Sequence, residues 1–274
     1  GKGGYASFPT LFAAKFLRIS VIIHESDTVP GKVSKWAGKF AKKIAISYQD
    51  AIEYFPKDKT AWTGQPVRAA IVKAATEGAK EYLKLEEGIP VVAIIGGSQG
   101  AMIINNVVLD ALPDLIQKYE VIHQTGVKNY KETSETANIV LGESENKRHY
   151  KPYPFLNDLA SKMVGGAANI IISRAGSAIF ELASWGVPSI IIPITNTNGD
   201  HQKKNAYAYA RNGACEVIEE SNLTASVLET AINDLLSNPE KIANMRRAAN
   251  EFFKPGAGHA IAEQVVKIAL SHEA

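Results

Sequence analysis

The chain has 274 residues, of which 46% are hydrophobic and 21% are charged. This composition excludes an intrinsically disordered chain and provides enough apolar side chains for one large domain or two modest ones. No apolar run approaches the ~18 residues of a membrane-spanning helix, and the first residues lack the basic and apolar regions of a signal peptide.

The chain contains a single cysteine, Cys215. A single cysteine excludes an internal disulfide and is typical of a protein in a reducing cytoplasm. Because Cys215 lies in an apolar, strand-like run with no obvious partner, we interpret it as a core residue rather than a nucleophile.

The net charge of +2 conceals an uneven distribution. Residues 1–68 contain 11 Lys and Arg against 5 Asp and Glu, a net charge of +6, whereas the rest of the chain carries −4. A basic segment beside an acidic one indicates that the basic segment faces an anionic partner. The charge pattern alone fits either nucleic acid or anionic lipid as that partner.

Residues 1–68 show the pattern of a small parallel α/β domain. The predicted elements are helices at residues 9–16 and 32–43 and strands at residues 20–24, 43–47 and 60–63. The chain opens without Met on Gly1-Lys2-Gly3-Gly4-Tyr5, directly in what reads as a functional turn. We therefore expect a shortened chain whose first domain lacks its first strands.

The predicted helix at residues 32–43 separates basic from apolar side chains. Its basic face would carry Lys32, Lys35, Lys39, Lys42 and Lys43, and its apolar face Val33, Trp36, Ala37, Phe40 and Ile44. A solvated basic stripe on a core-facing helix is the interpretation we favour, and attraction to anionic lipid headgroups is the alternative. The preceding helix carries a similar mixture at Phe12, Lys15, Phe16 and Arg18.

From residue 89 onward, short β-branched runs alternate with helical stretches, which is typical of a parallel sheet covered by helices. The predicted strands lie at residues 91–95, 120–123, 169–173, 188–193 and 214–218. The predicted helices lie at residues 101–115, 177–185, 202–212, 223–236, 239–253 and 258–270. We expect a first domain at residues 1–68, a second doubly wound domain at 69–254, and a C-terminal segment at 255–274 whose helix returns toward the first domain.

A glycine-rich turn follows the predicted strand at residues 91–95. Gly96-Gly97-Ser98-Gln99-Gly100 leads into a predicted helix. Its glycines let the backbone approach a phosphate, and the free N–H groups of the helix start attract an anion. Ser98 adds a hydroxyl donor. The turn is neither a G-x-G-x-x-G motif nor a Walker loop, so a turn that only packs is the alternative.

A second turn of this kind is Ser173-Arg174-Ala175-Gly176-Ser177, which again leads from a strand into a helix. Glu181 lies about one turn inside that helix. A carboxylate in this place suits either ribose hydroxyls or a helix cap. For Glu181 taken alone, capping is the simpler interpretation.

A third predicted helix starts at Asp200-His201-Gln202 and continues through Asn205. The amides of Gln202 and Asn205 share one face and can both donate to and accept from sugar hydroxyls. His201 is a candidate general base, although an isolated loop histidine more often has another role.

All three helix starts follow the carboxyl ends of parallel strands, where open α/β sheets bind ligands. We therefore predict that a nucleotide diphosphate binds in one crevice. No metal site is predicted, because the sequence has no Asp-x-Asp pair for Mg²⁺ and no His or Cys cluster with zinc spacing. Helix dipoles and N–H groups would then stabilise the departing diphosphate.

Together these motifs resemble the MurG family over essentially the whole chain. Gly1-Lys2-Gly3-Gly4-Tyr5 resembles the family's second glycine loop, and His24-Glu25 its His-Glu pair. Gly64-Gln65-Pro66-Val67-Arg68 is similar to the Gly-Asn-Pro-Val-Arg end of the first domain. Gly96 to Gly100 equals the family's Gly-Gly-Ser-Gln-Gly signature and is the most specific match. The turns at Gly176 and His201 complete the set.

The resemblance implies an α/β fold of the GT-B type, with two doubly wound, Rossmann-like domains of which the first is incomplete. It implies inverting transfer of N-acetylglucosamine from UDP-N-acetylglucosamine to the C4 hydroxyl of the undecaprenyl-linked muramoyl-pentapeptide, from lipid I to lipid II, in peptidoglycan synthesis. It also implies no tightly bound cofactor, no nucleic-acid partner, and a peripheral position at the anionic cytoplasmic face of the cell membrane.

The resemblance further implies site residues, carried over by position. The implied donor-binding residues are Asp27, Arg68, Ser98, Leu156, Gly176, Ser177, Ala178, Ile179, Phe180, Glu181, His201, Gln202 and Asn205. Among them, Arg68 and Ser98 would contact the diphosphate, Leu156 the uracil and Glu181 the ribose. The acceptor loop would contain Gly3, Gly4 and Tyr5. The catalytic base is not identified, and Glu25 and His201 are its candidates.

The sequence departs from the family pattern in three places. The interval from Arg174 to Glu181 is one residue shorter than in the family. The family's first glycine loop does not occur in this chain, and Ser26-Asp27 stands where the family has Gln-Asn. Asp27 cannot donate a hydrogen bond as Asn does.

Two alternatives stay open. One is another UDP-sugar enzyme of the GT-B fold, either a glycolipid glycosyltransferase or a UDP-N-acetylglucosamine epimerase, although an epimerase should need further catalytic carboxylates and histidines. The other is a nucleotide-binding fragment without activity, which the missing first loop favours for the chain as given.

Overall fold

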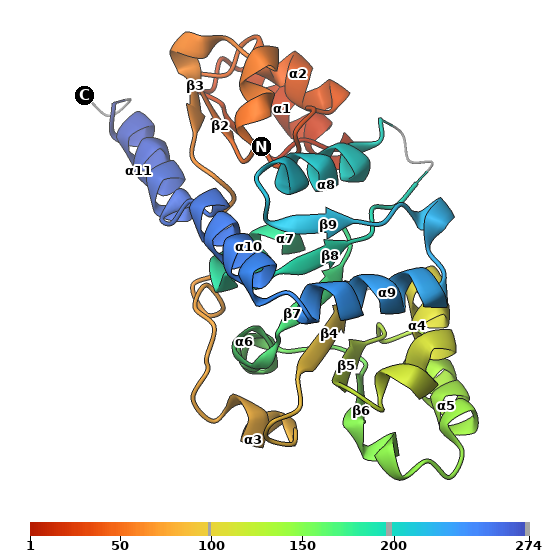
Figure 1. Ribbon diagram of the computed structural model, residues 1–274. Helices are drawn as coiled ribbons and strands as arrows, with labels where there is room; N and C mark the ends of the chain where they lie inside the picture. Colours follow the sequence, from red (N-terminus) through yellow and green to blue (C-terminus); the bar gives the residue numbers. More distant parts are fainter. Residues whose placement is uncertain (98–99, 196–198, 272–274) are drawn as a thin grey trace. The chain divides into compact units, whose positions relative to one another are not determined.

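The computed structural model describes residues 1–97, 100–195 and 199–271. Contacts divide the chain into two compact units. The first unit comprises Gly1–Val67, Asn196–Ala208 and Phe253–Ala274, and the second Arg68–Thr195 and Tyr209–Phe252. Each unit has its own parallel sheet (Figure 1). The predicted domain boundaries stay a prediction, because contacts do not test which segments fold independently.

The first unit is a three-stranded parallel sheet with the strand order β1-β2-β3. Its elements are η1 (Tyr5–Ser7), α1 (Phe8–Phe16), β1 (Ile22–Glu25), α2 (Lys32–Gly38), β2 (Lys43–Ile46), η2 (Gln49–Tyr54), η3 (Lys57–Lys59), β3 (Thr60–Trp62) and α11 (Ala257–Leu270). Ile23 pairs with Ile44 across β1 and β2, and both side chains are buried. They join Leu11 of α1 and Ala37 of α2 in one hydrophobic cluster, so burial of apolar side chains holds these helices against the sheet.

The predicted helix at residues 32–43 is too long. Helix α2 ends at Gly38, where a Cβ atom would lie 2.6 Å from the ring of Phe55. The chain then turns and enters β2 at Lys43, with Lys42 N–H donating to the carbonyl of Val21. Lys39, Lys42 and Lys43 therefore do not belong to a helical basic face, although all three side chains are exposed.

The second unit is a six-stranded parallel sheet with the order β6-β5-β4-β7-β8-β9. Its strands are β4 (Val91–Ile95), β5 (Glu120–Gln124), β6 (Tyr150–Tyr153), β7 (Ile170–Ser173), β8 (Ser189–Ile191) and β9 (Cys215–Val217). The first three strands extend the sheet in one direction, and β7 then pairs with the other side of β4. This is the strand order of a dinucleotide-binding Rossmann sheet, and β4 and β7 flank its point of reversal.

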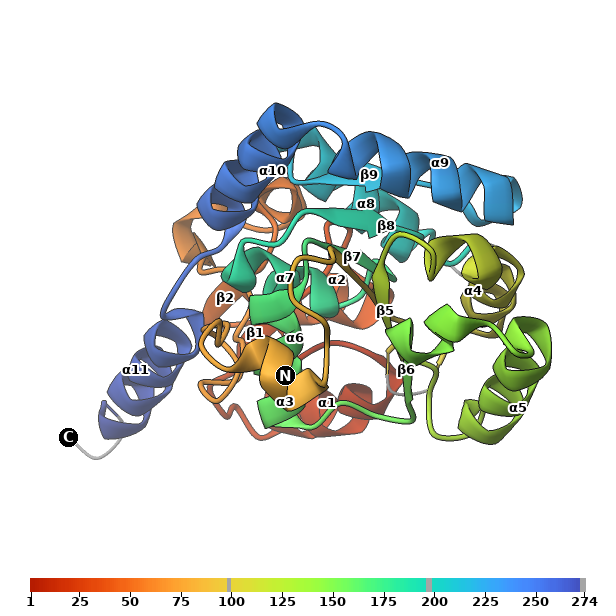
Figure 2. The ribbon, with the colours of Figure 1, turned by 60° about the horizontal axis from the view of Figure 1, so that its bottom comes forward.

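Helices cover both faces of this sheet. They are α3 (Ala79–Leu83), α4 (Met102–Leu115), α5 (Tyr130–Leu141), α6 (Asp158–Ala167), α7 (Ala178–Trp185), α9 (Ala225–Leu236) and α10 (Pro239–Phe252), with η4 (Glu145–His149) and η5 (Glu220–Asn222); α8 (His201–Arg211) runs from the first unit into the second. Helix α4 packs against α5 and α9, whereas α7 packs against α10 (Figures 1 and 2). Alternate strand residues such as Val92 and Ile94 share a core cluster with α4, α5 and α9, as the period of a strand requires.

Five elements between residues 79 and 167 were not predicted: α3, α5, η4, β6 and α6. Helix α5 is polar and buries few of its side chains, so it lacks a strong apolar stripe. Strand β6 contains Lys151 and Pro152 and lies at the edge of the sheet, where a missing N–H is tolerated. The local sequence pattern therefore does not reveal either α5 or β6, because the position of each depends on its neighbours in the fold.

Cys215 is buried at the start of β9, and burial raises the pKa of its thiol. The predicted core role is confirmed. Among the helices of the described residues, none combines the length and the apolar content needed to span a bilayer.

Candidate functional site

The carboxyl ends of β4 and β7 lie side by side in the second unit. Ile95, the last residue of β4, pairs with Ser173, the last residue of β7, and Ser173 Oγ donates to the Ile95 carbonyl at 2.9 Å. Both predicted glycine turns therefore begin at adjacent strand ends. The loops that follow these ends flank the crevice in which sheets of this order bind nucleotides.

The first turn is shaped by glycines in the left-handed region. Gly97 has φ +85° and Gly100 has φ +73°. A Cβ atom on Gly100 would lie 2.2 Å from the carbonyl oxygen of Thr125, so only glycine fits there without a shift. Ala101, the N-cap of α4, makes no side-chain cap, which leaves backbone N–H groups at the helix start for an anion. Ser98 lies outside the described residues, and its predicted role stays a prediction.

The second turn leaves open space at Gly176. A Cβ atom there would have no neighbour within 4 Å among the described residues. Ser177 is exposed at the N-cap of α7 and makes no side-chain cap, so its side chain does not cover this helix start. Ile179 and Phe180 are buried. Their N–H groups donate to the carbonyls of Gly176 and Ser177, at 3.2 and 3.1 Å.

Arg174, in the same turn, connects two neighbouring loops. Its Nη2 donates to Oε1 of Glu220 at 2.8 Å, and its Nη1 donates to the Ile192 carbonyl at 3.2 Å. Glu220 Oε2 accepts from both N and Oγ1 of Thr195. The guanidinium thus ties the loop after β8 to the loop after β9.

Arg68 lies between two carboxylates of the second unit. Its Nη1 pairs with Asp158 Oδ1, and its Nη2 lies 3.6 Å from Glu181 Oε1. The Arg68 side chain is 56% exposed and that of Glu181 30%, so the guanidinium is accessible to a ligand. Burial raises the pKa of Glu181, and the positive charge of Arg68 opposes that rise. The simple capping interpretation of Glu181 does not account for this pair.

Leu156 lies at the turn before α6. Its side chain is buried, and its carbonyl accepts from Ser161 Oγ at 3.3 Å. Asn157 caps α6 by accepting from Ala160 N–H at 2.8 Å. The cap holds Asp158 at the first position of the helix, where it meets Arg68.

In the first unit, α8 begins beside the loop that follows β1. Asn205 donates from Nδ2 to Asp27 Oδ1 at 2.8 Å, and its Oδ1 accepts from N and Oγ1 of Thr28. His201 Nδ1 lies 3.8 Å from Asp27 Oδ2. Asn205 is only 2% exposed, so its amide holds the loop in place. Gln202, one residue beyond His201, is half-buried on the same helix.

Glu25 is the buried end of β1. Its Oε1 accepts from the N–H groups of Ser26 and Asp27, at 2.9 and 3.1 Å. Burial raises the pKa of Glu25, while the hydroxyl of Ser34 and these N–H groups oppose that rise. A carboxylate with a raised pKa is a better proton acceptor than an exposed one.

The acceptor loop predicted at Gly3, Gly4 and Tyr5 lies next to Glu25. Gly3 and Gly4 have φ values of +69° and +75°. A Cβ atom on Gly3 would lie 2.5 Å from Ser34 Oγ and 3.8 Å from Glu25 Oε2. Tyr5 is 90% exposed. The structure therefore brings this loop and one candidate base together within the first unit.

Comparisons with known proteins agree with this geometry. The profile described as the glycosyltransferase family 28 C-terminal domain matches residues 91–261, and that of the N-terminal domain matches residues 1–46. A UDP-N-acetylglucosamine--N-acetylmuramyl-(pentapeptide) pyrophosphoryl-undecaprenol N-acetylglucosamine transferase from Thermodesulfovibrio yellowstonii is 39% identical over 99% of this chain and 72% of its own length. The transferase of the same name from Listeria welshimeri is 33% identical over 98% of this chain and 73% of its own length. The chain belongs to the MurG family.

Solved structures place this MurG-family chain in the GT-B fold. The crystal structure of Acinetobacter baumannii MurG matches with a TM-score of 0.76 at 26% identity, over 97% of this chain and 73% of that one. The UDP-GlcNAc 2-epimerase of Neisseria meningitidis bound to UDP-GlcNAc matches with a TM-score of 0.68 at 15% identity, over 97% of this chain and 75% of that one. The second likeness shows the shared fold alone.

The predicted site residues of this MurG-family chain fall into two groups. Arg68, Leu156, Glu181 and the turn at residues 176–180 belong to the second unit, and the remaining described ones belong to the first. Asp158 was missed by sequence reasoning. The Asn157-Asp158 pair is typical of a helix start and could have drawn attention to this residue. Its partner Arg68, however, lies 90 residues away in the sequence, so the contact could not be inferred from it.

Proposed function

We propose that this chain transfers N-acetylglucosamine from UDP-N-acetylglucosamine to the lipid-linked muramoyl-pentapeptide, converting lipid I into lipid II in peptidoglycan synthesis. The observation that carries the proposal is the pair of glycine turns at the reversal point of a Rossmann-ordered sheet, in a chain of the MurG family. Sheets of this order bind nucleotides at that point.

The diphosphate of the donor would lie between the turn after β4 and the start of α7. Uncapped helix starts supply N–H groups and positive dipole ends there. Arg68 adds a positive charge that a ligand can reach, because its side chain is more than half exposed. Its partner Glu181 would accept hydrogen bonds from the ribose hydroxyls. The charge that develops on UDP as it leaves would be stabilised by these groups.

In the transfer step, the C4 hydroxyl oxygen of the acceptor forms a bond to the anomeric carbon, and the bond from that carbon to the UDP oxygen breaks. The configuration inverts because the hydroxyl attacks opposite the leaving group. The hydroxyl proton must pass to a base. Glu25 is the stronger candidate, since burial raises the pKa of its carboxyl and the acceptor loop lies against it. His201, beside Asp27, is the second candidate.

The membrane surface would be met by α1. Phe12 is 55% and Phe16 81% exposed on this helix, and Lys15 lies over the ring of Trp36 at 5.6 Å. An apolar surface with basic neighbours suits an anionic bilayer. The family implies a peripheral membrane protein, and we place this chain at the cytoplasmic face, where its nucleotide donor is available.

An epimerase shares the fold, so fold alone does not distinguish the two activities. Membership in glycosyltransferase family 28 does. A transferase uses the donor sugar without changing its configuration at C2, whereas an epimerase inverts that centre.

The donor site is tested by replacing Gly176 with alanine. The added methyl group would enter open space at the turn, so we expect unchanged folding and about tenfold weaker binding of UDP-N-acetylglucosamine. Binding is measured by thermal shift and calorimetry with UDP-N-acetylglucosamine, UDP-glucose and UDP, and transfer is measured with labelled donor and lipid I.

The matched control is Gly31→Ala, because Gly31 also has open space around it but lies at the start of α2. We expect UDP-N-acetylglucosamine to stabilise the parent selectively. Gly176→Ala should weaken this stabilisation, and Gly31→Ala should not. Stabilisation by an unrelated nucleotide, with none by any UDP-sugar, would sink the proposal.

A further inference from the structure

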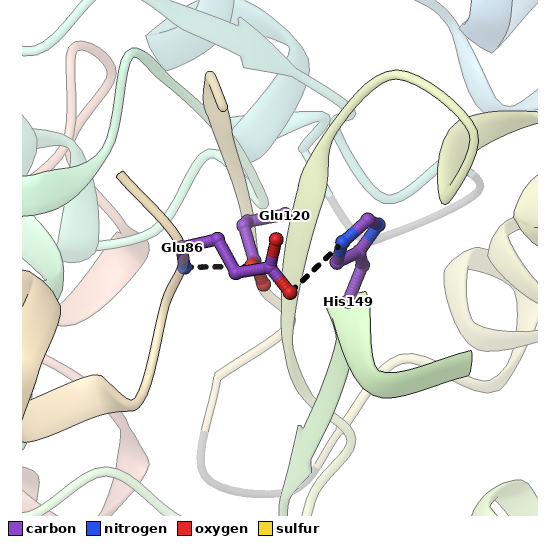
Figure 3. Close-up of side chains that lie close together, drawn as sticks. All are labelled: Glu86, Glu120 and His149. Atoms are coloured by element: carbon purple, nitrogen blue, oxygen red, sulfur yellow. Dashed lines mark hydrogen bonds and ion pairs between the residues drawn. The ribbon is translucent and has the colours of Figure 1, made fainter. Parts of the chain in front are cut away.

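Three side chains that could coordinate a metal ion meet in the second unit. They lie away from the donor turns, by which we mean the glycine turns at residues 96–100 and 173–177. Glu86, Glu120 and His149 each place one oxygen or nitrogen atom within 4.8 Å of the others. Figure 3 shows their polar ends directed toward one another. Within residues 1–97, 100–195 and 199–271, this is the one group of three or more His, Cys, Asp or Glu with such spacing. The residues are far apart in the sequence, so ligand spacing could not reveal them.

The imidazole of His149 has a defined orientation. Its Nδ1 lies 2.8 Å from the carbonyl oxygen of Ile116. Because a carbonyl only accepts, Nδ1 carries a proton, and in the neutral tautomer that this requires the lone pair lies on Nε2. That nitrogen lies 3.5 Å from Glu86 Oε1. A histidine held at one nitrogen by a backbone carbonyl is the usual arrangement of a metal-binding imidazole.

Two buried polar atoms of this cluster lack hydrogen bonds. Glu120 is fully buried at the start of β5, and its Oε1 accepts from Glu86 N–H at 2.9 Å. Within the described part of the chain, Glu120 Oε2 and His149 Nε2 have no hydrogen-bond partner. A buried carboxylate oxygen and a buried imidazole lone pair are costly to leave unsatisfied, and a cation satisfies both.

We propose that Glu86, Glu120 and His149 bind a divalent transition-metal ion of the Zn²⁺ class. One imidazole and two carboxylates form a ligand set that suits zinc. Two ligand atoms of a tetrahedral zinc site lie about 3.4 Å apart at ordinary bond lengths, and His149 Nε2 and Glu86 Oε1 are 3.5 Å apart. The Glu86 side chain is 42% exposed, which gives the ion an entry path and leaves room for a water as fourth ligand.

Arg148 competes for one of these ligands. Its Nε lies 2.5 Å from Glu86 Oε1, and its side chain is 66% exposed. The guanidinium can therefore move into solvent when the ion binds. Without a metal, the same cluster would be an ion-paired group in which Arg148 contributes favourably. If the cluster binds an ion, removing Arg148 should leave the zinc affinity equal or raise it. If the cluster is only an ion-paired group, removing Arg148 should lower the stability of the fold.

The proposed ion would be structural. Glu120 begins β5, and His149 immediately precedes β6, so the cluster lies at the amino ends of the strands. The donor turns follow the carboxyl ends, about 13 Å away along a five-residue strand. The ion would join the segment before β4 to the starts of β5 and β6. Binding would stabilise the folded unit by mass action.

The test uses the full chain after treatment with a chelator and dialysis. We expect calorimetry with ZnCl₂ to give one ion per chain and thermal unfolding to shift upward with zinc. Glu86→Gln and His149→Gln should each weaken zinc binding by at least about tenfold. Because Glu86 is partly exposed, the Glu86→Gln variant should fold even if a variant at the buried Glu120 does not. Arg148→Ala should bind zinc as tightly as the parent or more tightly.

The matched control is His259→Gln, because His259 also faces a carboxylate, Glu263 Oε1 at 3.0 Å, but is 81% exposed. This change should leave zinc binding intact. Co²⁺ in place of zinc should give visible absorption bands that His149→Gln abolishes. The proposal is overturned if zinc gives no binding, if Glu86→Gln and His149→Gln bind zinc like the parent, or if Arg148→Ala weakens binding.

Discussion

Buried polar side chains of the first unit are held by specific partners. His24 lies on β1 with its Nε2 3.0 Å from Ser47 Oγ, and that hydroxyl donates to Gln65 Oε1 at 2.8 Å. Asn205 is similarly engaged with Asp27 and Thr28. Such residues maintain the shape of a site, whereas the exposed guanidinium of Arg68 can contact a ligand directly.

His24 should make stability depend on pH. Burial, aided by the charge of Lys2, lowers its pKa from 6.5 to about 4. Between these values the unfolded chain binds a proton that the folded chain does not, so stability falls as the pH falls from 6.5 toward 4. The loss should approach about 3 kcal/mol at pH 4. Urea unfolding of the parent and of His24→Gln at pH 7 and pH 4 measures it.

His24→Gln should show a smaller difference between the two pH values, because glutamine does not titrate. His259→Gln is the control, since His259 is exposed, and it should follow the parent. Equal pH dependence in the parent and in His24→Gln would show that this imidazole does not titrate differently in the folded state.

At the scale of elements, glycines decide how strands pass into helices. Gly97 and Gly100 occupy one turn, and both have positive φ. Their surroundings differ: a Cβ atom on Gly97 would meet no described atom within 4 Å, whereas one on Gly100 would lie 2.2 Å from the Thr125 carbonyl. The turn after β4 is therefore confined by the start of the loop after β5.

Replacement of each glycine by alanine separates backbone strain from steric clash. Gly97→Ala should destabilise the chain by about 1–2 kcal/mol, the cost of a left-handed non-glycine residue. Gly100→Ala should cost more than about 3 kcal/mol, because backbone must move as well. Urea unfolding provides both values, and similar losses in the two variants would contradict the steric argument.

At the scale of the whole molecule, charge and exposed apolar surface distinguish the two units. The first 68 residues carry a net charge of +6, and α1 exposes Phe12 and Phe16 beside basic residues. The Rossmann-ordered sheet of the second unit carries the two glycine turns that we propose to bind the donor. This division suits an enzyme whose two substrates are a water-soluble nucleotide sugar and a membrane lipid.

Attachment to membranes should depend on α1. We expect the chain to sediment with phosphatidylglycerol vesicles and much less with phosphatidylcholine vesicles. The double change Phe12→Ser and Phe16→Ser should weaken vesicle binding by at least about tenfold, since each phenylalanine side chain that enters the bilayer contributes about 1.5–3 kcal/mol. High salt should weaken binding further by screening the lysines.

The matched control for this measurement changes Val265 and Val266 of α11 to serine. Both are exposed apolar residues of the same unit, at 50% and 55%. Their replacement should leave vesicle binding unchanged. Equal losses in the two double variants, or equal binding to neutral and anionic vesicles, would rule out a specific role of α1.

Most of the fold could be predicted from local patterns. The strands β4, β7 and β8 are short apolar runs followed by turns, and the Gly96 and Gly176 turns mark their carboxyl ends. Helix α2 was predicted too long, because the amphipathic pattern continues past Gly38 while the ring of Phe55 ends the helix by packing. Strand β6 was missed because Pro152 is tolerated only where an edge strand needs no N–H.

The sequence by itself determined the fold class, the positions of the glycine turns and the resemblance to the family, because each depends on neighbouring residues and regular periods. Only the tertiary structure decided that Arg68 meets Asp158 and Glu181, that Asn205 braces the loop after β1, and that Glu86, Glu120 and His149 converge. These contacts join residues far apart in the chain, so they depend on the order in which strands enter the sheet, which no local pattern specifies.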